Sequence, residues 1–301
     1  MKALSRDEVI AKYPKFNVIL GHSRYELGQE LTAQIPQVNK VFYAFSIHYE
    51  QYDRVPYENI EAQADRFVNL CNIVQDEESV KNLMAYLNTK MTGDVSHILK
   101  VYNRQMSFYN NDVFKMSEHE SFFDIGAYNG DTIKLFLEET NGRYDRIIAL
   151  EPDDDSFLEL NESIARERLR NVITSKNGAW DRCEELQFKT GNEQISSVDT
   201  GDNILNASNV ITIHADRIDY MFESENITFI KINYYEGITQ AIKGCEGILK
   251  EQHPKLAMDV GFDIYKVLEL AEYISSLNEG YRLYLRFNRA MSSTFTLYAA
   301  V

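Results

Sequence analysis

Residues 124–132 have the composition of a ligand-binding turn, with two acids and two glycines directly after an apolar run. Glycine lets the backbone turn sharply and approach a ligand closely, and Asp131 or Thr132 can cap the helix predicted to follow. A further acid, Glu151, ends the apolar run 147–150. In a Rossmann-like unit, an acid at the end of the second strand binds the ribose hydroxyls of a nucleoside. The two segments therefore predict a nucleoside-binding site.

The glycine spacing and the first acid of the turn narrow the class of nucleoside. Gly126 and Gly130 do not form the G-x-G-x-x-G pattern that is typical of dinucleotide-binding turns. The carboxylate of Asp124 would repel a pyrophosphate, but it suits a cationic nucleoside that carries an amino acid. S-adenosylmethionine is such a ligand and is therefore the expected cofactor.

A site of this kind needs parallel strands whose carboxyl ends lie side by side. Apolar runs predict these strands, and helical patterns such as 264–277 alternate with them. No helical pattern separates the last two runs, so we expect a hairpin in which one strand is antiparallel to the rest. This is the outline of an α/β class I methyltransferase sheet. The predicted strands are 122–125, 147–150, 171–175, 228–233, 255–260, 281–286 and 294–298, with 185–188 and 210–214 as added or edge strands.

The chain divides into three predicted parts. Residues 1–57 form a small N-terminal α/β unit, in which strands at 16–21 and 40–45 enclose a helix. This unit could bind a nucleotide, pack against the rest or form a dimer surface, so a homodimer is one candidate assembly. Residues 58–115 are a helical region and an aromatic link, and residues 116–301 are the cofactor-binding domain.

Composition excludes several classes of partner. The net charge is -15, whereas nucleic acids and anionic membranes attract basic surfaces. No apolar run is long enough for a spanning helix, and the first residues are too polar for a signal peptide. The cysteines, Cys71, Cys183 and Cys245, lack metal-site spacing and are odd in number. We therefore expect a cytoplasmic protein with free thiols and no metal.

Beyond the turn, the chain resembles the FkbM family of S-adenosylmethionine-dependent methyltransferases over residues 60–301. The resemblance is carried by segments 76–94, 108–112, 124–132, 150–152, 229–231, 241–244, 254–257 and 297–299. It implies that the cofactor lies across the turn, with its ribose on Glu151 and its adenine near Asn177. The cofactor-binding residues that it implies are Asp124, Gly126, Ala127, Tyr128, Asn129, Gly130, Asp131, Thr132, Glu151, Pro152, Asn177, Gly178 and Ala179.

The chain departs from the family where the acceptor is expected to bind. After Ile-Lys-x the family usually has Asp, an aliphatic residue, Glu and Gly, whereas this chain has Asn233, two tyrosines and Glu236 before Gly237. A histidine that often ends the next strand is also missing. Methyl transfer to a hydroxyl needs a group that removes a proton, which asparagine cannot do. The candidate catalytic residues are Lys231, Asn233 and Glu236, with His214 as a fallback base.

The resemblance implies O-methylation of a sugar or another small hydroxylated acceptor, in glycan or natural-product synthesis. Two alternatives stay open. The altered acceptor side could belong to a cofactor-binding protein that acts as a partner or regulatory subunit. The segment 233–235 also has a faint similarity to the loop of N-methyltransferases, without its prolines.

Overall fold

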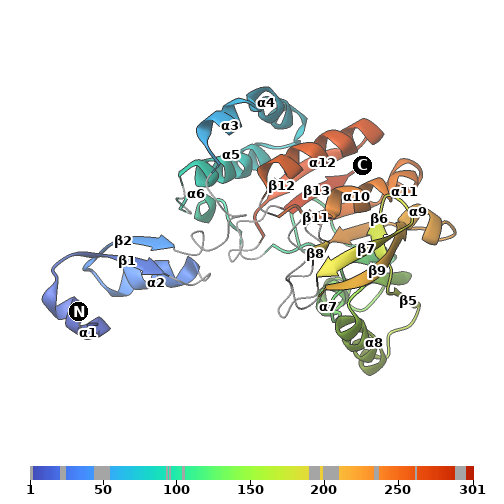
Figure 1. Ribbon diagram of the computed structural model, residues 1–301, viewed down its shortest axis with the longest axis horizontal. Coiled ribbons are helices and arrows are strands. Elements are labelled where there is room, and N and C mark those ends of the chain that lie inside the picture. The colour runs from blue at the N-terminus through green and yellow to red at the C-terminus, as the bar shows by residue number, and fades with distance from the viewer. Residues whose placement is uncertain are drawn as a thin grey trace.

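A computed structural model describes residues 3–20, 25–43, 55–92, 94, 96–103, 106–189, 197–198, 210–233, 237–261, 263–288 and 296–301. The chain forms a central sheet with helices on both faces, a smaller sheet beside it and an N-terminal unit to one side (Figure 1). Among these residues, no helix combines the length and the apolar character needed to cross a membrane.

The central sheet has seven strands in the order β12-β13-β11-β10-β3-β4-β5. All neighbouring strands are parallel except β13, which is antiparallel to both β11 and β12. This confirms the predicted mostly parallel sheet with a terminal antiparallel strand. The strands are β3 (Ser121–Ile125), β4 (Arg146–Leu150), β5 (Val172–Ser175), β10 (Phe229–Ile232), β11 (Lys255–Asp259), β12 (Arg282–Arg286) and β13 (Thr296–Ala300).

Both faces of the sheet are covered, which explains why its inner strands read as continuous apolar runs. Successive residues of a strand point to opposite faces. Phe123 and Ile148 accordingly belong to one core with α4 (Ala64–Ile73), α5 (Glu77–Thr92), α10 (Ile238–Lys243), α11 (Glu246–Glu251) and α12 (Ile264–Leu277). Phe122 and Ile147 belong to the other, with α7 (Asp131–Glu139) and α8 (Asp154–Glu167). Short helices α3 (Tyr57–Glu61), α6 (Ser96–Leu99) and α9 (Ile218–Met221) complete this part.

Helix α5 covers the edge strand β12 through polar side chains. The Ser79 hydroxyl accepts a hydrogen bond from the backbone N–H of Leu285, and the Asn82 side-chain oxygen accepts one from that of Phe287. Arg286 is buried and binds the carboxylates of Asp76 and Asp112. The hydrogen bonds to Ser79 and Asn82 satisfy backbone donors that an uncovered sheet edge would expose.

The smaller sheet has the order β6-β9-β7-β8 and holds the segments predicted as added or edge strands. Its strands are β6 (Gly178–Trp180), β7 (Glu184–Lys189), β8 (Ser197–Val198) and β9 (Val210–Arg217). Strand β6 is parallel to β9, whereas β7 is antiparallel to both β9 and β8. Because only two residues separate β6 from the end of β5, the sheet lies beside the carboxyl ends of the central strands.

The N-terminal unit consists of α1 (Arg6–Lys12), β1 (Phe16–Leu20), α2 (Tyr25–Gln34) and β2 (Val38–Tyr43), with β1 and β2 parallel. This is the predicted β-α-β arrangement, although the division of the whole chain into three domains stays a prediction. Ile19 and Phe42 are paired across the two strands and are both exposed.

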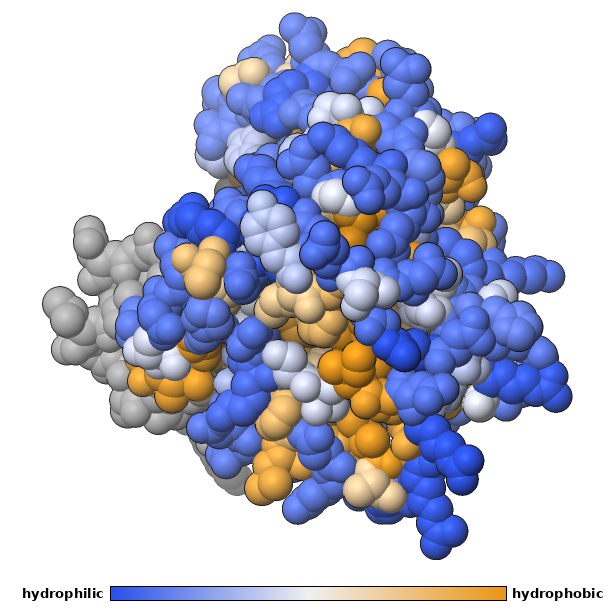
Figure 2. All heavy atoms as spheres, turned by 90° about the vertical axis from the view of Figure 1, so that its right-hand side faces the viewer, coloured by the Kyte–Doolittle hydropathy of each residue, from blue (hydrophilic) through white to orange (hydrophobic). Residues whose placement is uncertain are grey.

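Figure 2 shows a mostly hydrophilic surface, in keeping with the charge of -15, with apolar residues gathered in its centre and lower half.

The turn between α10 and α11 depends on a glycine that touches the smaller sheet. A Cβ atom at Gly244 would lie 1.9 Å from the carbonyl oxygen of Trp180. We expect Gly244→Ala to lower the free energy of unfolding by about 3 kcal/mol, because two backbones would have to move apart. Urea unfolding measures the change. Gly247→Ala is the control: its Cβ would meet only the Asp219 side chain, at 3.3 Å, and a change within about 1 kcal/mol is expected there. Equal losses in both variants would contradict this account of the contact.

Candidate functional site

A cleft lies at the carboxyl ends of β3, β4 and β10. Chain order runs from β3 outward through β4 and β5, and then returns to β10 on the other side of β3. Ligands of open α/β sheets bind at such a switch point. The cleft is lined by Ile125, Gly126, Tyr128, Asp131, Leu150, Glu151, Pro152, Asn177, Gly178, Ala179, Phe188, Ile213 and Asn233.

The turn after β3 has a conformation that only a few residue types adopt easily. Gly126 has φ 75° and Gly130 has φ 88°, and between them Tyr128 has φ 49°. The N–H groups of Gly126 and Ala127 both donate to the carbonyl oxygen of Leu150, at 3.0 Å. A left-handed tyrosine is strained, and such strain is typical of functional sites. The turn is therefore held against the end of β4, with its backbone beside the cleft.

Glu151 is the buried acid of the cleft. Its carboxylate accepts hydrogen bonds from the backbone N–H of Tyr128, at 2.8 Å, and of Asp153, at 3.0 Å. The residue is only 5% exposed. Burial outweighs these two hydrogen bonds and raises the pKa of Glu151 to about 7. A carboxylate has about four acceptor positions, so Glu151 can accept further hydrogen bonds from a ligand in the cleft.

Asp124 does not face the cleft, which differs from the electrostatic role that its sequence position suggested. It is fully buried and accepts hydrogen bonds from the Lys231 ammonium, at 2.7 Å, and from the Thr132 hydroxyl, at 2.6 Å. Lys231 also donates to the carbonyl oxygen of Gly126, at 2.9 Å. The charge of Asp124 is thus neutralised inside the protein. Asp124, Thr132 and Lys231 position the turn and do not line the cleft.

Most of the other predicted residues line the cleft, and the rest lie elsewhere. Asp131, Pro152, Asn177, Gly178, Ala179 and Asn233 line the cleft together with Gly126, Tyr128 and Glu151. Ala127 is buried in the core beneath the turn, and Asn129 and Gly130 line a separate hollow between α7 and α8. Glu236 lies outside the described residues. Because Asp124 is paired with Lys231 and does not line the cleft, the carboxylates among the described lining residues are those of Asp131 and Glu151.

The smaller sheet supplies one wall of the cleft, which the sequence reasoning missed. Phe188 on β7 and Ile213 on β9 are both buried and line the cleft beside Ala179. The alternation of apolar and polar residues along 210–217 was a usable signal, because it predicts one buried face. His214 follows Ile213 and is exposed, so it points to the opposite face of the sheet. The structure therefore places this fallback base away from the cleft.

Comparison with known proteins supports the fold. No family model and no curated protein matches the chain. The structure is similar to that of methyltransferase FkbM from Methylobacillus flagellatus KT, with a TM-score of 0.74 and 18% identity over 94% of this chain and 73% of that one. Two further structures are less similar, each with a TM-score of 0.39. One is an rRNA methylase from Streptococcus thermophilus (14% identity; 62% of this chain, 88% of that one), and the other is Aeropyrum pernix fibrillarin with natively bound S-adenosyl-L-methionine (10% identity; 63% and 70%). The strand order, the cleft at the switch point and the first match together show that this chain has the class I methyltransferase fold, in the form found in that FkbM structure.

Proposed function

We propose that this protein is an S-adenosylmethionine-dependent methyltransferase of the FkbM family. The observation that carries the proposal is the buried carboxylate of Glu151, aimed into a cleft at the switch point of the sheet. An acid at the end of the second strand is the usual partner of ribose hydroxyls in Rossmann-like folds. The sequence resemblance and the similarity of fold both support the assignment.

The residues of the cleft fit this cofactor. Glu151 has acceptor positions left for the two ribose hydroxyls. Apolar side chains of Phe188 and Ile213, beside the small residues Gly178 and Ala179, suit a flat adenine ring. Asp131 is exposed at the start of α7 and supplies a negative charge toward the ammonium group of the cofactor's amino-acid part. S-adenosylmethionine, when bound, supplies an electrophilic methyl group on its sulfonium.

For the acceptor we propose a sugar or another small hydroxylated molecule. Asn233 follows β10 and lines the cleft, and its amide can both donate to and accept from a hydroxyl group. It cannot take a proton. We therefore propose Asn233 as an orienting residue and Glu236 as the base.

Two measurements made together test the function. Calorimetry with S-adenosylhomocysteine should show binding at one site per chain, and incubation with methyl-labelled S-adenosylmethionine and a panel of hydroxylated sugars should label an acceptor. Glu236→Gln should abolish the labelling while binding persists. Absence of binding would overturn the cofactor assignment, and labelling of amines alone would overturn O-methylation.

The second candidate is a cofactor-binding partner or regulatory subunit without turnover. It is favoured by one observation: at the end of β10 the described lining residue is an asparagine, which cannot be a general base. Tight binding of S-adenosylhomocysteine without transfer to any acceptor, in the wild type and in Asn233→Asp alike, would support this candidate. Transfer that appears in Asn233→Asp alone would show that the cleft is intact but lacks a base.

The exposed carboxylate of Asp131 gives a prediction about charge in the cleft. We expect Asp131→Asn to weaken S-adenosylhomocysteine binding about tenfold. The variant loses the charge that faces the ammonium group of the ligand, and a hydrogen bond between charged groups contributes about 1.5 kcal/mol. Calorimetry measures the affinity, and the unfolding temperature should stay unchanged. Asp155→Asn, in the first turn of α8 and absent from the lining residues, is the matched control. An unchanged affinity in Asp131→Asn would remove Asp131 from the cofactor site.

A further inference from the structure

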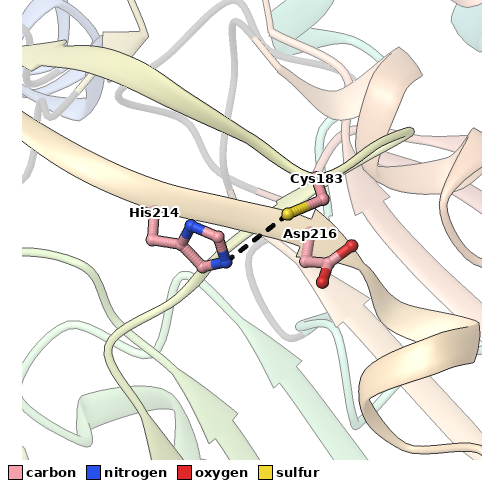
Figure 3. A group of neighbouring side chains, drawn as sticks. All are labelled: Cys183, His214 and Asp216. Atoms are coloured by element: carbon pink, nitrogen blue, oxygen red, sulfur yellow. Dashed lines mark hydrogen bonds between the residues drawn. The ribbon is translucent and has the colours of Figure 1, made fainter.

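Three side chains with metal-ligating atoms meet on the face of the smaller sheet that is turned away from the cleft. Cys183 lies in the turn between β6 and β7, and His214 and Asp216 lie two residues apart on β9 (Figure 3). Residues at this spacing on a strand point to the same side. Ile213 lines the cleft from the other side of β9, so the cluster is separate from the proposed cofactor site.

The distances between the three groups are close to those of a metal centre. The sulfur of Cys183 lies 3.8 Å from Nε2 of His214, and the possible ligand atoms of all three residues lie within 4.8 Å of one another. In tetrahedral zinc sites the metal–sulfur and metal–nitrogen bonds are about 2.3 and 2.0 Å, which puts sulfur and nitrogen about 3.5 Å apart. Small side-chain rotations would therefore complete the geometry.

Glu185 orients the histidine for this role. It is paired with His214 across β7 and β9, and its carboxylate oxygen lies 3.2 Å from Nδ1 of the ring. An Nδ1–H donated to this carboxylate leaves the lone pair of Nε2 on the side of Cys183. Metal-binding histidines usually donate their other nitrogen to a carboxylate or carbonyl in this way, which fixes the ring and raises its basicity.

We propose that Cys183, His214 and Asp216 bind one zinc ion, with Glu185 as a positioning residue. A thiolate, an imidazole and a carboxylate suit zinc rather than the hard cations magnesium and calcium. The thiolate and the carboxylate together balance the charge of a divalent ion. Cys183 and His214 are exposed, so a water molecule can take the fourth position. The ion would link the β6–β7 turn to β9, the strand that carries Ile213.

The positions of the three ligands in the chain explain why the sequence predicted no metal. The expectation of no metal was based on the spacing between cysteines. The three ligands are instead spread over 34 residues, and they come from a turn and a strand that only the sheet brings together. The proposal does not depend on the methyltransferase assignment, because neither the cleft residues nor the cofactor takes part.

Metal titration of the full chain tests the proposal. The protein is stripped with a chelator, kept reduced with a phosphine that does not bind zinc, and titrated with zinc against a chromophoric chelator. We expect one equivalent to bind and to raise the unfolding temperature. Cobalt should give the near-ultraviolet absorption of a thiolate–cobalt bond, and Cys183→Ser should abolish that absorption. Glu185→Gln should retain binding but weaken it about 10- to 100-fold.

His119 provides the matched control. Its Nδ1 lies 3.2 Å from a carboxylate oxygen of Asp145, the same arrangement as in His214, but it belongs to no ligand cluster among the described residues. His119→Gln should leave zinc binding unchanged, whereas His214→Gln should weaken it at least 100-fold. Failure of the wild type to bind one equivalent, or equal affinities in the wild type, Cys183→Ser and His214→Gln, would overturn the proposal.

Discussion

Lowering the pH from about 8 to about 6 should weaken S-adenosylhomocysteine binding about tenfold, through protonation of Glu151. Burial raises the pKa of this carboxyl to about 7 in the free protein. The ionised form accepts hydrogen bonds from ribose hydroxyls, whereas the protonated form gives up part of its acceptor capacity. Calorimetry across this range measures the change. In Glu151→Gln the affinity should be at least tenfold lower at the higher pH and nearly independent of pH, and a pH dependence that persists would assign the titration to another group.

The carboxyl of Glu151 should also make the free energy of unfolding depend on pH. Lowering the pH should weaken cofactor binding but stabilise the fold. Its pKa in the folded protein, about 7, lies above the ordinary value of 4.5, so the folded state holds this proton more tightly than the unfolded state does. The resulting stabilisation is complete below the ordinary pKa and is lost as the pH rises through about 7. From about pH 5 to about pH 8 the loss is about 2 to 3 kcal/mol.

Glu151→Gln stays neutral and should escape this loss. Without cofactor, the free energy of unfolding of the variant in urea should therefore change little between about pH 5 and about pH 8, whereas that of the wild type should fall. A variant whose stability no longer falls with rising pH, while it loses affinity, would show that the ionised carboxylate is kept for binding, at a cost to the fold. An equal fall in stability between about pH 5 and about pH 8 in both proteins would contradict the raised pKa of Glu151.

Lys231→Met should have the largest effect on folding, a loss of about 3 to 5 kcal/mol in the free energy of unfolding. Lys231 and Asp124 are both fully buried, and their charged groups lie 2.7 Å apart. Removing the ammonium leaves the Asp124 carboxylate in the interior without its counter-charge. It also removes the hydrogen bond to the carbonyl oxygen of Gly126, which holds the turn of the cleft. Urea unfolding measures the loss.

Two further variants separate the buried charge from a general effect of losing lysine. Lys243→Met removes a lysine whose ion pair with Glu269 is partly exposed, and it should cost less than about 1 kcal/mol. The double variant Asp124→Asn with Lys231→Met leaves no buried charge in the pair, so its loss should be smaller than the sum of the two single losses. Additive losses, or a loss in Lys231→Met no larger than in Lys243→Met, would show that the pair is not coupled.

The sequence by itself determined the central sheet and the place of the cleft. Strands buried on both faces read as continuous apolar runs, and the missing helix between the last two runs predicted that one strand is antiparallel, which β13 confirms. The glycine turn and Glu151 were identified for a similar reason, since a strand end and the turn after it are local features of the chain. Their roles in binding stay predictions.

Only the tertiary structure decided which side chains face the ligand and which face one another. Lys231 and Asp124 are 107 positions apart and meet because β10 and β3 are neighbours in register. Phe188 and Ile213 are brought to one face of the smaller sheet and the Cys183 cluster to the other, and the strands of this sheet come from separate segments of the sequence. Hydrophobic periodicity records burial along one element, but the partner of a charged or ligating group depends on strand order and register, which that periodicity does not contain.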